Sequence, residues 1–281
     1  MRNKLSYAVL GGGLALIAGS ALWLVLTGAA DIRYSADHGD TVPMWHRWIP
    51  VLAGLALVRL VPPRTEPSGG VTGGRGVRVQ AGVLLVAALV FAVALRWSGG
   101  GEPTHTVLKL ALLSAVPAVL FRWSRRDPVT LVREPLTAWR RYGPAAPVAA
   151  WLVLSYAGPL ALPASDFAAT VDPLTLVVTV VVVFVVNALL EEVFYRRWLQ
   201  TRWEHLLGPW PAIVLSSLLW ASWHIGIQGT GDLPRDLASA FVNQGVQGLF
   251  LGYLWSRYRL MWPLLVVHGA VNAAPILLGM L

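Results

Sequence analysis

Two adjacent glutamates lie in one of the most apolar parts of the chain. Glu191 and Glu192 follow a run of mostly valine at residues 174–186. A charged side chain inside a bilayer costs about 2.5–3.5 kcal/mol on insertion scales, so charges retained there usually serve a function. Carboxylates in an apolar, water-restricted site are suited to general acid–base catalysis.

The spacing of these acids and a nearby arginine predicts different roles for the two glutamates. Glu192 and Arg196 are four residues apart, so on a helix they share a face and can form an ion pair. Glu191 points about 100° away from Glu192. We therefore predict that Arg196 neutralises Glu192 and that Glu191 is left free as a general base. The alternative is that the two acids only mark the cytoplasmic end of a membrane span.

Two histidines in later apolar runs complete the candidate site. His224 follows Trp220 by four residues, and His268 precedes Asn272 by four, so each pair shares a helix face. Together with Glu191 they predict one intramembrane active site. For either histidine alone, the alternative is a hydrogen bond between helices.

A further polar group precedes a pair of glycines. Asn243, Gln244 and Gln247 could line a polar cavity or hydrogen-bond neighbouring helices. Gly248 and Gly252 are four residues apart, a spacing that lets helices approach closely.

Metal-dependent and metal-free chemistry both fit the candidate residues. Glu191, His224 and His268 would form a zinc ligand set of one carboxylate and two imidazoles, so a zinc enzyme is an alternative to a site without cofactor. The chain has no cysteine, which excludes disulfides and a thiol nucleophile. It also has no His-Glu-x-x-His, Gly-x-Ser-x-Gly or Walker motif.

The composition indicates the elements that position these residues. The chain is 56% hydrophobic and 13% charged, with a mean hydropathy of +0.61, whereas soluble proteins carry about 25% charged residues. We expect an all-α, polytopic transmembrane helix bundle of eight to nine spans. The apolar segments are residues 5–27, 48–61, 79–95, 106–121, 147–162, 174–192, 211–227, 237–255 and 262–280. The sixth helix is expected to continue past Arg196 towards Trp203.

The basic residues predict the orientation. With a cytoplasmic N-terminus, 17 of the 22 Lys and Arg residues fall on the cytoplasmic side, as the positive-inside rule requires. The five outside are Arg33, Arg47, Arg96, Lys109 and Arg235. This distribution explains the net charge of +8 without a nucleic-acid partner, and it directs the basic loops to anionic lipid head groups.

Three motifs in order resemble one known family. The segment Glu191-Glu192-Val-Phe-Tyr-Arg196 looks like the EExxxR motif of the CPBP family of intramembrane proteases, also called the CAAX protease or Abi family. Its best-known members are the type II CAAX prenyl endopeptidases. His268-Gly-Ala-Val-Asn272 resembles the HxxxN motif, and Trp220-Ala-Ser-Trp-His224 resembles FxxxH with tryptophan for phenylalanine. The motif region is 172–274, within an expected catalytic membrane core at 144–281 that follows variable transmembrane helices at 1–143.

The resemblance implies a mechanism. It implies a conical cavity open to the cytoplasm, in which Glu191 and His224 activate water. His268 and Asn272 would stabilise the oxyanion. Glu192 and Arg196 would be an orienting ion pair, in a glutamate peptidase without metal.

The resemblance also suggests a setting and leaves alternatives. The substrate would be a peptide or membrane protein, and the Arg-, Ala- and Gly-rich composition suggests a multi-pass protein of a bacterial plasma membrane. One alternative is a non-catalytic immunity or scaffold protein on the same fold. Another is a transporter that uses the acids as a relay, although the chain lacks visible inverted repeats.

Overall fold

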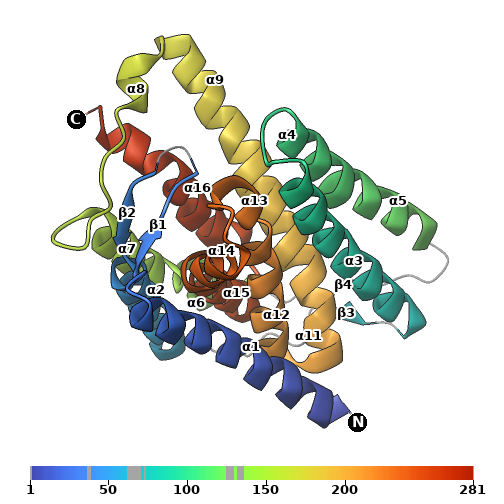
Figure 1. The fold of residues 1–281 in the computed structure, drawn as a ribbon. Coiled ribbons are helices and arrows are strands. Elements are labelled where there is room, and N and C mark those ends of the chain that lie inside the picture. Colours follow the sequence, from blue (N-terminus) through green and yellow to red (C-terminus); the bar gives the residue numbers. More distant parts are fainter. Residues whose placement is uncertain are drawn as a thin grey trace.

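Helices form nearly all of the structure. The computed structural model describes residues 2–36, 39–61, 71–72, 74–124, 130–131 and 136–280, and Figure 1 shows them as a helical bundle. Two short antiparallel pairs are the strands of the described part: β1 (Asp31–Arg33) with β2 (Thr41–Pro43), and β3 (Val71–Thr72) with β4 (Thr130–Leu131). The predicted all-α class is confirmed.

The helices follow each other along the chain with short connections. The first group is α1 (Arg2–Leu26), α2 (Met44–Leu60), α3 (Arg75–Trp97), α4 (Thr104–Lys109), the π-helix η1 (Leu110–Ala115), α5 (Val116–Trp123), α6 (Ala138–Tyr142) and α7 (Ala145–Tyr156). The next group is α8 (Phe167–Thr170), α9 (Pro173–Val183), the π-helix η3 (Phe184–Leu189), α10 (Leu190–Glu192), the π-helix η4 (Val193–Gln200) and α11 (Thr201–Leu207). The last group is α12 (Pro209–Ser222), α13 (Ile225–Gln228), α14 (Leu233–Ala240), the π-helix η5 (Phe241–Gly245), α15 (Val246–Tyr258) and α16 (Met261–Leu278).

Six of the described helices are long and apolar enough to cross a bilayer, and the chain is an integral membrane protein. They are Lys4–Leu26, Arg75–Trp97, Thr104–Trp123, Pro173–Leu207, Pro209–Gln228 and Met261–Leu278. The count of nine spans and the orientation of the N-terminus stay predictions. The apolar segment expected at 147–162 extends beyond the observed helix, since α7 ends at Tyr156. The helix stops there because Gly158 adopts a positive φ of +79° and Pro159 cannot continue a helix.

One long helix carries the two glutamates. The elements from α9 to α11 form a continuous helix of 35 residues, Pro173–Leu207, which is about 50 Å long and exceeds the roughly 30 Å core of a bilayer. The predicted continuation past Arg196 is therefore confirmed. Glu191 and Glu192 lie well inside this helix and are 1% and 0% exposed, which favours a role in a buried site over the alternative that they only mark the end of a span.

The start of this helix is capped by an aspartate. Asp172 Oδ1 accepts hydrogen bonds from the backbone N–H groups of Leu174 and Thr175 at 3.0 and 3.1 Å. Hydrogen bonds from the side chain and backbone of Thr175 hold the pKa of Asp172 below its usual value. The cap fixes the residue at which the long helix begins. Because the helix is continuous, this start also sets how far along it α10 and its two glutamates lie.

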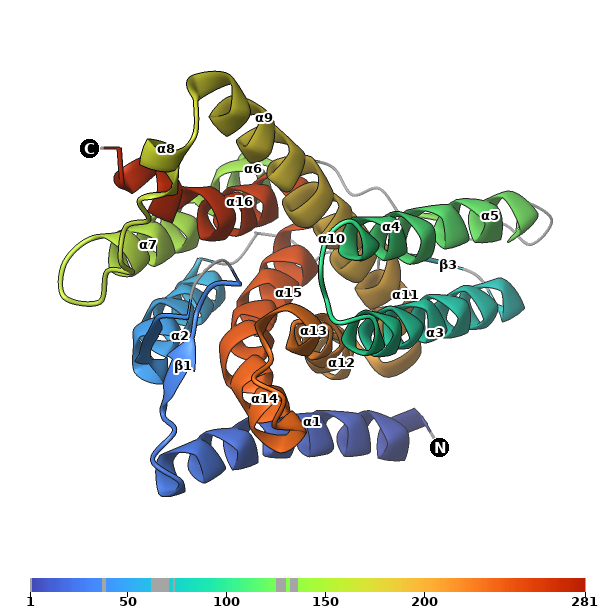
Figure 2. The same ribbon diagram turned by 45° about the horizontal axis from the view of Figure 1, so that its top comes forward.

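In the middle of the bundle α12 packs against α15, and α1 lies along the edge of the bundle against α12 (Figure 2). At Gly248 of α15, an added Cβ atom would lie 2.8 Å from Ser217 Cβ and 3.0 Å from Ser217 Cα of α12. A side chain at this position would push the two helices apart. The predicted close approach at this glycine is therefore present in the structure.

We predict that Gly248→Ala lowers thermal stability by about 1–3 kcal/mol, the usual effect of overpacking. Gly82→Ala is the matched control, since Gly82 lies inside α3 with no atom within 4 Å of an added Cβ. That change should be neutral or stabilising because alanine favours helix. Thermal unfolding of both variants in detergent checks the prediction, and equal stability of the two would contradict it.

Candidate active site

A cavity of about 490 Å³ lies among the helices that carry the motifs. Glu191 of α10, His224 at the junction of α12 and α13, and both His268 and Asn272 of α16 line it. The fold thus brings these four predicted residues together from three separate stretches of sequence.

Glu191 is held by two donors inside the protein. Its Oε2 accepts a hydrogen bond from Trp220 Nε1 at 2.6 Å, and its Oε1 accepts one from Lys109 Nζ at 2.7 Å. The prediction that Glu191 is left free of a cation is therefore wrong. The reason is tertiary, because the partner comes from a helix about 80 residues earlier in the chain.

Lys109 is a site residue that the sequence reasoning missed. It was expected outside the membrane, but it is 0% exposed. Its ammonium also donates to Asn187 Oδ1 at 2.7 Å and lies 4.7 Å from the centre of the Trp223 ring. A signal was present: no acid lies within four residues of this lysine on its own apolar helix, so a buried ammonium there must find its partner on another helix.

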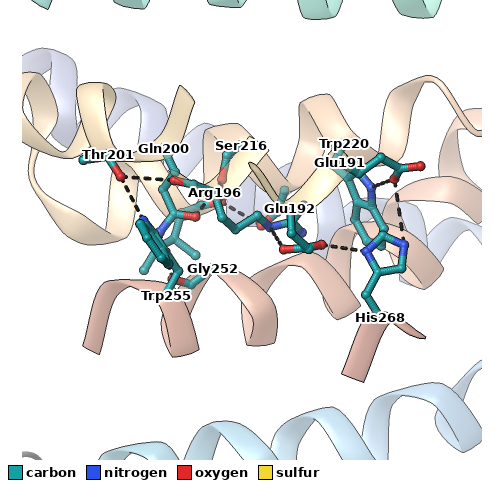
Figure 3. A network of polar contacts seen from close by, with 12 residues as sticks. Glu191, Glu192, Arg196, Gln200, Thr201, Ser216, Trp220, Gly252, Trp255 and His268 are labelled. Atoms are coloured by element: carbon teal, nitrogen blue, oxygen red, sulfur yellow. Dashed lines mark hydrogen bonds and ion pairs between the residues drawn. The ribbon is translucent and has the colours of Figure 1, made fainter. Parts of the chain in front are cut away.

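Glu192 forms a second charged group just behind the cavity. His268 Nδ1 lies 2.7 Å from Glu192 Oε1, and Arg196 Nε lies 3.4 Å from Glu192 Oε2 (Figure 3). His268 Nε2 is 3.9 Å from Glu191 Oε2. One imidazole thus connects two carboxylates that leave the helix in different directions. The Arg196 guanidinium also lies 4.6 Å from the centre of the Trp220 ring, a cation–π distance.

The backbone fixes the orientation of His224. Its Nδ1 lies 2.9 Å from the carbonyl oxygen of Trp220. A carbonyl oxygen only accepts, so Nδ1 carries the proton, and Nε2 of the neutral ring is a free acceptor. The ring stacks on Trp223 with centroids 3.8 Å apart and meets the Trp220 ring edge-on at 5.1 Å. Trp220 therefore orients this histidine through both its carbonyl and its ring.

Asn272 supplies an unused donor. Its Nδ2 is buried and has no hydrogen-bond partner among the described residues. Because buried polar groups are nearly always paired, this amide is suited to a group that enters the cavity.

The amides of η5 and α15 form the opposite wall. Asn243, Gln244 and Gln247 all line the cavity. Asn243 Oδ1 also accepts from Arg47 Nε at 3.0 Å, and Gln244 Nε2 donates to Gln228 Oε1 at 2.7 Å. Both roles considered for these residues, cavity lining and helix-to-helix bonding, are present.

The three residues of the zinc alternative do not fit a metal ion. Within the part of the chain that is described, no group of three or more His, Asp or Glu side chains is arranged to bind a metal. Both oxygens of Glu191 already accept hydrogen bonds, and one of the donors is the Lys109 ammonium. The Lys109 ammonium, 2.7 Å from Glu191 Oε1, would repel a metal cation bound to the same carboxylate.

Comparison with protein families agrees with the motifs. Residues 173–274 match the family model described as Type II CAAX prenyl endopeptidase Rce1-like. The match of this segment supports an assignment to the CAAX protease (CPBP) family. Comparisons with curated proteins and with solved structures gave no significant match.

The family assignment supports the activity of a CAAX-protease-like membrane endopeptidase. The matched segment contains all the motif residues, Glu191, Glu192, Arg196, His224, His268 and Asn272. Lys109 lies outside it, in the region expected to be variable. A helix outside the matched segment therefore contributes a residue to the cavity site.

We predict that Lys109→Met lowers stability by about 3–5 kcal/mol, because it leaves a buried carboxylate without its cation. Adding Glu191→Gln to Lys109→Met should recover most of the loss, since it removes the unpaired charge. Arg197→Met is the control, because Arg197 is exposed. Thermal unfolding of the wild type, Lys109→Met, Glu191→Gln and the double variant forms a double-mutant cycle, with Arg197→Met measured beside it. Additive effects of the two single changes would contradict the pairing.

Proposed function

We propose that this protein is a membrane endopeptidase of the glutamate type, acting on a peptide or membrane-protein substrate in a bacterial plasma membrane. The observation that carries this proposal is the convergence of Glu191, His224, His268 and Asn272 on one buried cavity. A base, a second acceptor and two donors are the groups that amide hydrolysis by water requires.

In the proposed reaction, a water molecule binds between the Glu191 carboxylate and His224 Nε2. Glu191 takes a proton from this water molecule while the water oxygen attacks the carbonyl carbon of the scissile peptide bond. The carbonyl π electrons move to oxygen, which gives a tetrahedral oxyanion. Glu191 then gives the proton to the amide nitrogen as the C–N bond breaks, so the products are a carboxylic acid and an amine.

The oxyanion is stabilised by His268 and Asn272. His268 Nδ1 donates to the Glu192 carboxylate, and this contact orients the ring so that Nε2 faces the cavity. Nε2 donates to the oxyanion when the ring is the imidazolium, which carries a proton on both nitrogens. The carboxylates of Glu192 and Glu191, at 2.7 and 3.9 Å from the two ring nitrogens, stabilise that form. Asn272 Nδ2 has no competing partner within the described part of the chain. Each such preorganised donor contributes about 3 kcal/mol in the transition state.

Lys109 and Trp220 position the base. They bind the two oxygens of Glu191 at 2.7 and 2.6 Å, which leaves the remaining lone pairs to receive the proton of water. Arg196 acts one step further away, by holding Glu192 against His268.

We predict that Glu191→Gln lowers the hydrolysis rate by about 10²–10⁴-fold, the usual contribution of a general base. The measurement is mass-spectrometric detection of new peptide termini after incubation of purified protein with a membrane-protein mixture. Glu102→Gln is the control, because this carboxylate is 61% exposed on a loop. Unchanged turnover in Glu191→Gln would remove Glu191 from the mechanism.

A second prediction concerns metal. Because Lys109 occupies one oxygen of Glu191, hydrolysis should continue at its full rate after treatment with a strong chelator. Loss of activity with the chelator and recovery on adding zinc would support the zinc alternative instead. If the purified wild type hydrolyses nothing, the binding-only immunity or scaffold function is the better explanation.

A further inference from the structure

The cavity opens at one particular end of the bundle, which we call the mouth face. Its lining includes Tyr34, Ser35 and Ala36, which follow β1, together with Leu162 and Ser165 from the loop before α8. Contacts join the elements of this end: Asn243 Nδ2 donates to the Arg33 carbonyl at 3.1 Å, and the Ser165 N–H donates to the Pro275 carbonyl at 2.8 Å.

The opposite end is joined by a different set of contacts. Arg202 Nε donates to Gln80 Oε1 at 2.7 Å, Arg140 Nε donates to the Tyr258 carbonyl at 2.8 Å, and Arg259 pairs with Glu204. We call this end the basic face. The helix α1 runs from the N-terminus at the basic face to β1 at the mouth face (Figures 1 and 2).

The charges of the described residues differ sharply between the two ends. The elements at the basic face carry twelve bases (Arg2, Lys4, Arg59, Arg75, Arg78, Arg122, Arg140, Arg141, Arg197, Arg202, Arg257 and Arg259) and one acid, Glu204. The elements at the mouth face carry four bases (Arg33, Arg47, Arg96 and Arg235) and seven acids (Asp31, Asp40, Glu102, Asp166, Asp172, Asp232 and Asp236). Lys109 belongs to neither end, because it is buried against Glu191.

Two expectations from the sequence conflict in this fold. The positive-inside rule directs the basic face, and with it the N-terminus, to the cytoplasm. A cavity open to the cytoplasm would require the mouth face there instead. The charge distribution favours the first expectation, since short basic connections stay in the cytoplasm while acidic ones have little effect on orientation.

We infer that the cavity faces away from the cytoplasm, and that the protein cleaves peptide segments exposed on the outer side of the membrane. The inference about the substrate rests on the proposed function, whereas the inference about orientation does not. A substrate would then be a secreted peptide or the outward-facing segment of a membrane protein, and it would reach Glu191 through the mouth face.

The absence of cysteine from the chain makes a direct test possible, because a single introduced thiol is labelled at one known place. Gly39 lies next to β2 at the mouth face, and Gly74 caps α3 at the basic face. Both are exposed, and an added Cβ atom would meet nothing within 4 Å at either. Gly39→Cys and Gly74→Cys are therefore a matched pair.

In intact spheroplasts, a membrane-impermeant maleimide should label Gly39→Cys at least tenfold more than Gly74→Cys. After permeabilisation both should label equally. Labelling of Gly74→Cys alone, or equal labelling of both in intact spheroplasts, would overturn the inferred orientation.

The same variants test the route of the substrate. Attaching a large polyethylene-glycol maleimide to purified Gly39→Cys should slow peptide hydrolysis several-fold, whereas attaching it to Gly74→Cys should not. Slowing by the label on Gly74→Cys alone would overturn the proposed entry side. If no variant hydrolyses peptides, the proposed function fails, while the labelling still decides which side the cavity faces.

Discussion

Two buried ion pairs constrain the whole site. Glu191 pairs with Lys109, and Glu192 pairs with Arg196, all four side chains being 1% exposed or less. A single unpaired charge in such surroundings costs several kcal/mol, and removing one partner of a buried pair is strongly destabilising. The helix of Lys109 must therefore pack against α10, although nothing in the family segment specifies that helix.

The π-helical segments explain how one helix presents adjacent acids to several partners. The short α10, which holds both glutamates, lies between η3 and η4. π-Helical turns change the direction of side chains and often occur at functional sites. Glu191 can then reach Lys109 and Trp220 while Glu192 reaches His268 and Arg196. An ideal α-helix predicts the divergence of the two acids but not these partners.

The sequence reasoning succeeded where a motif lies on one helix and failed where partners come from different helices. Spacing alone predicted the contact of Glu192 with Arg196 and the shared face of His268 and Asn272. It predicted that Glu191 has no cationic partner, and it placed Lys109 among the residues on the outer side of the membrane. A lysine near the end of an apolar helix usually extends to the interface, and only packing against α10 shows that this one does not.

The sequence by itself determined the membrane environment, the helical class and the set of motif residues, because hydropathy and helical spacing are local properties. It also determined the charge difference between the two ends of the bundle. Only the tertiary structure decided that Lys109 completes the site and that the cavity opens at the less basic end. Both depend on which helices are neighbours, and neighbours are chosen by side-chain packing and by the pairing of buried charges, which no single segment contains.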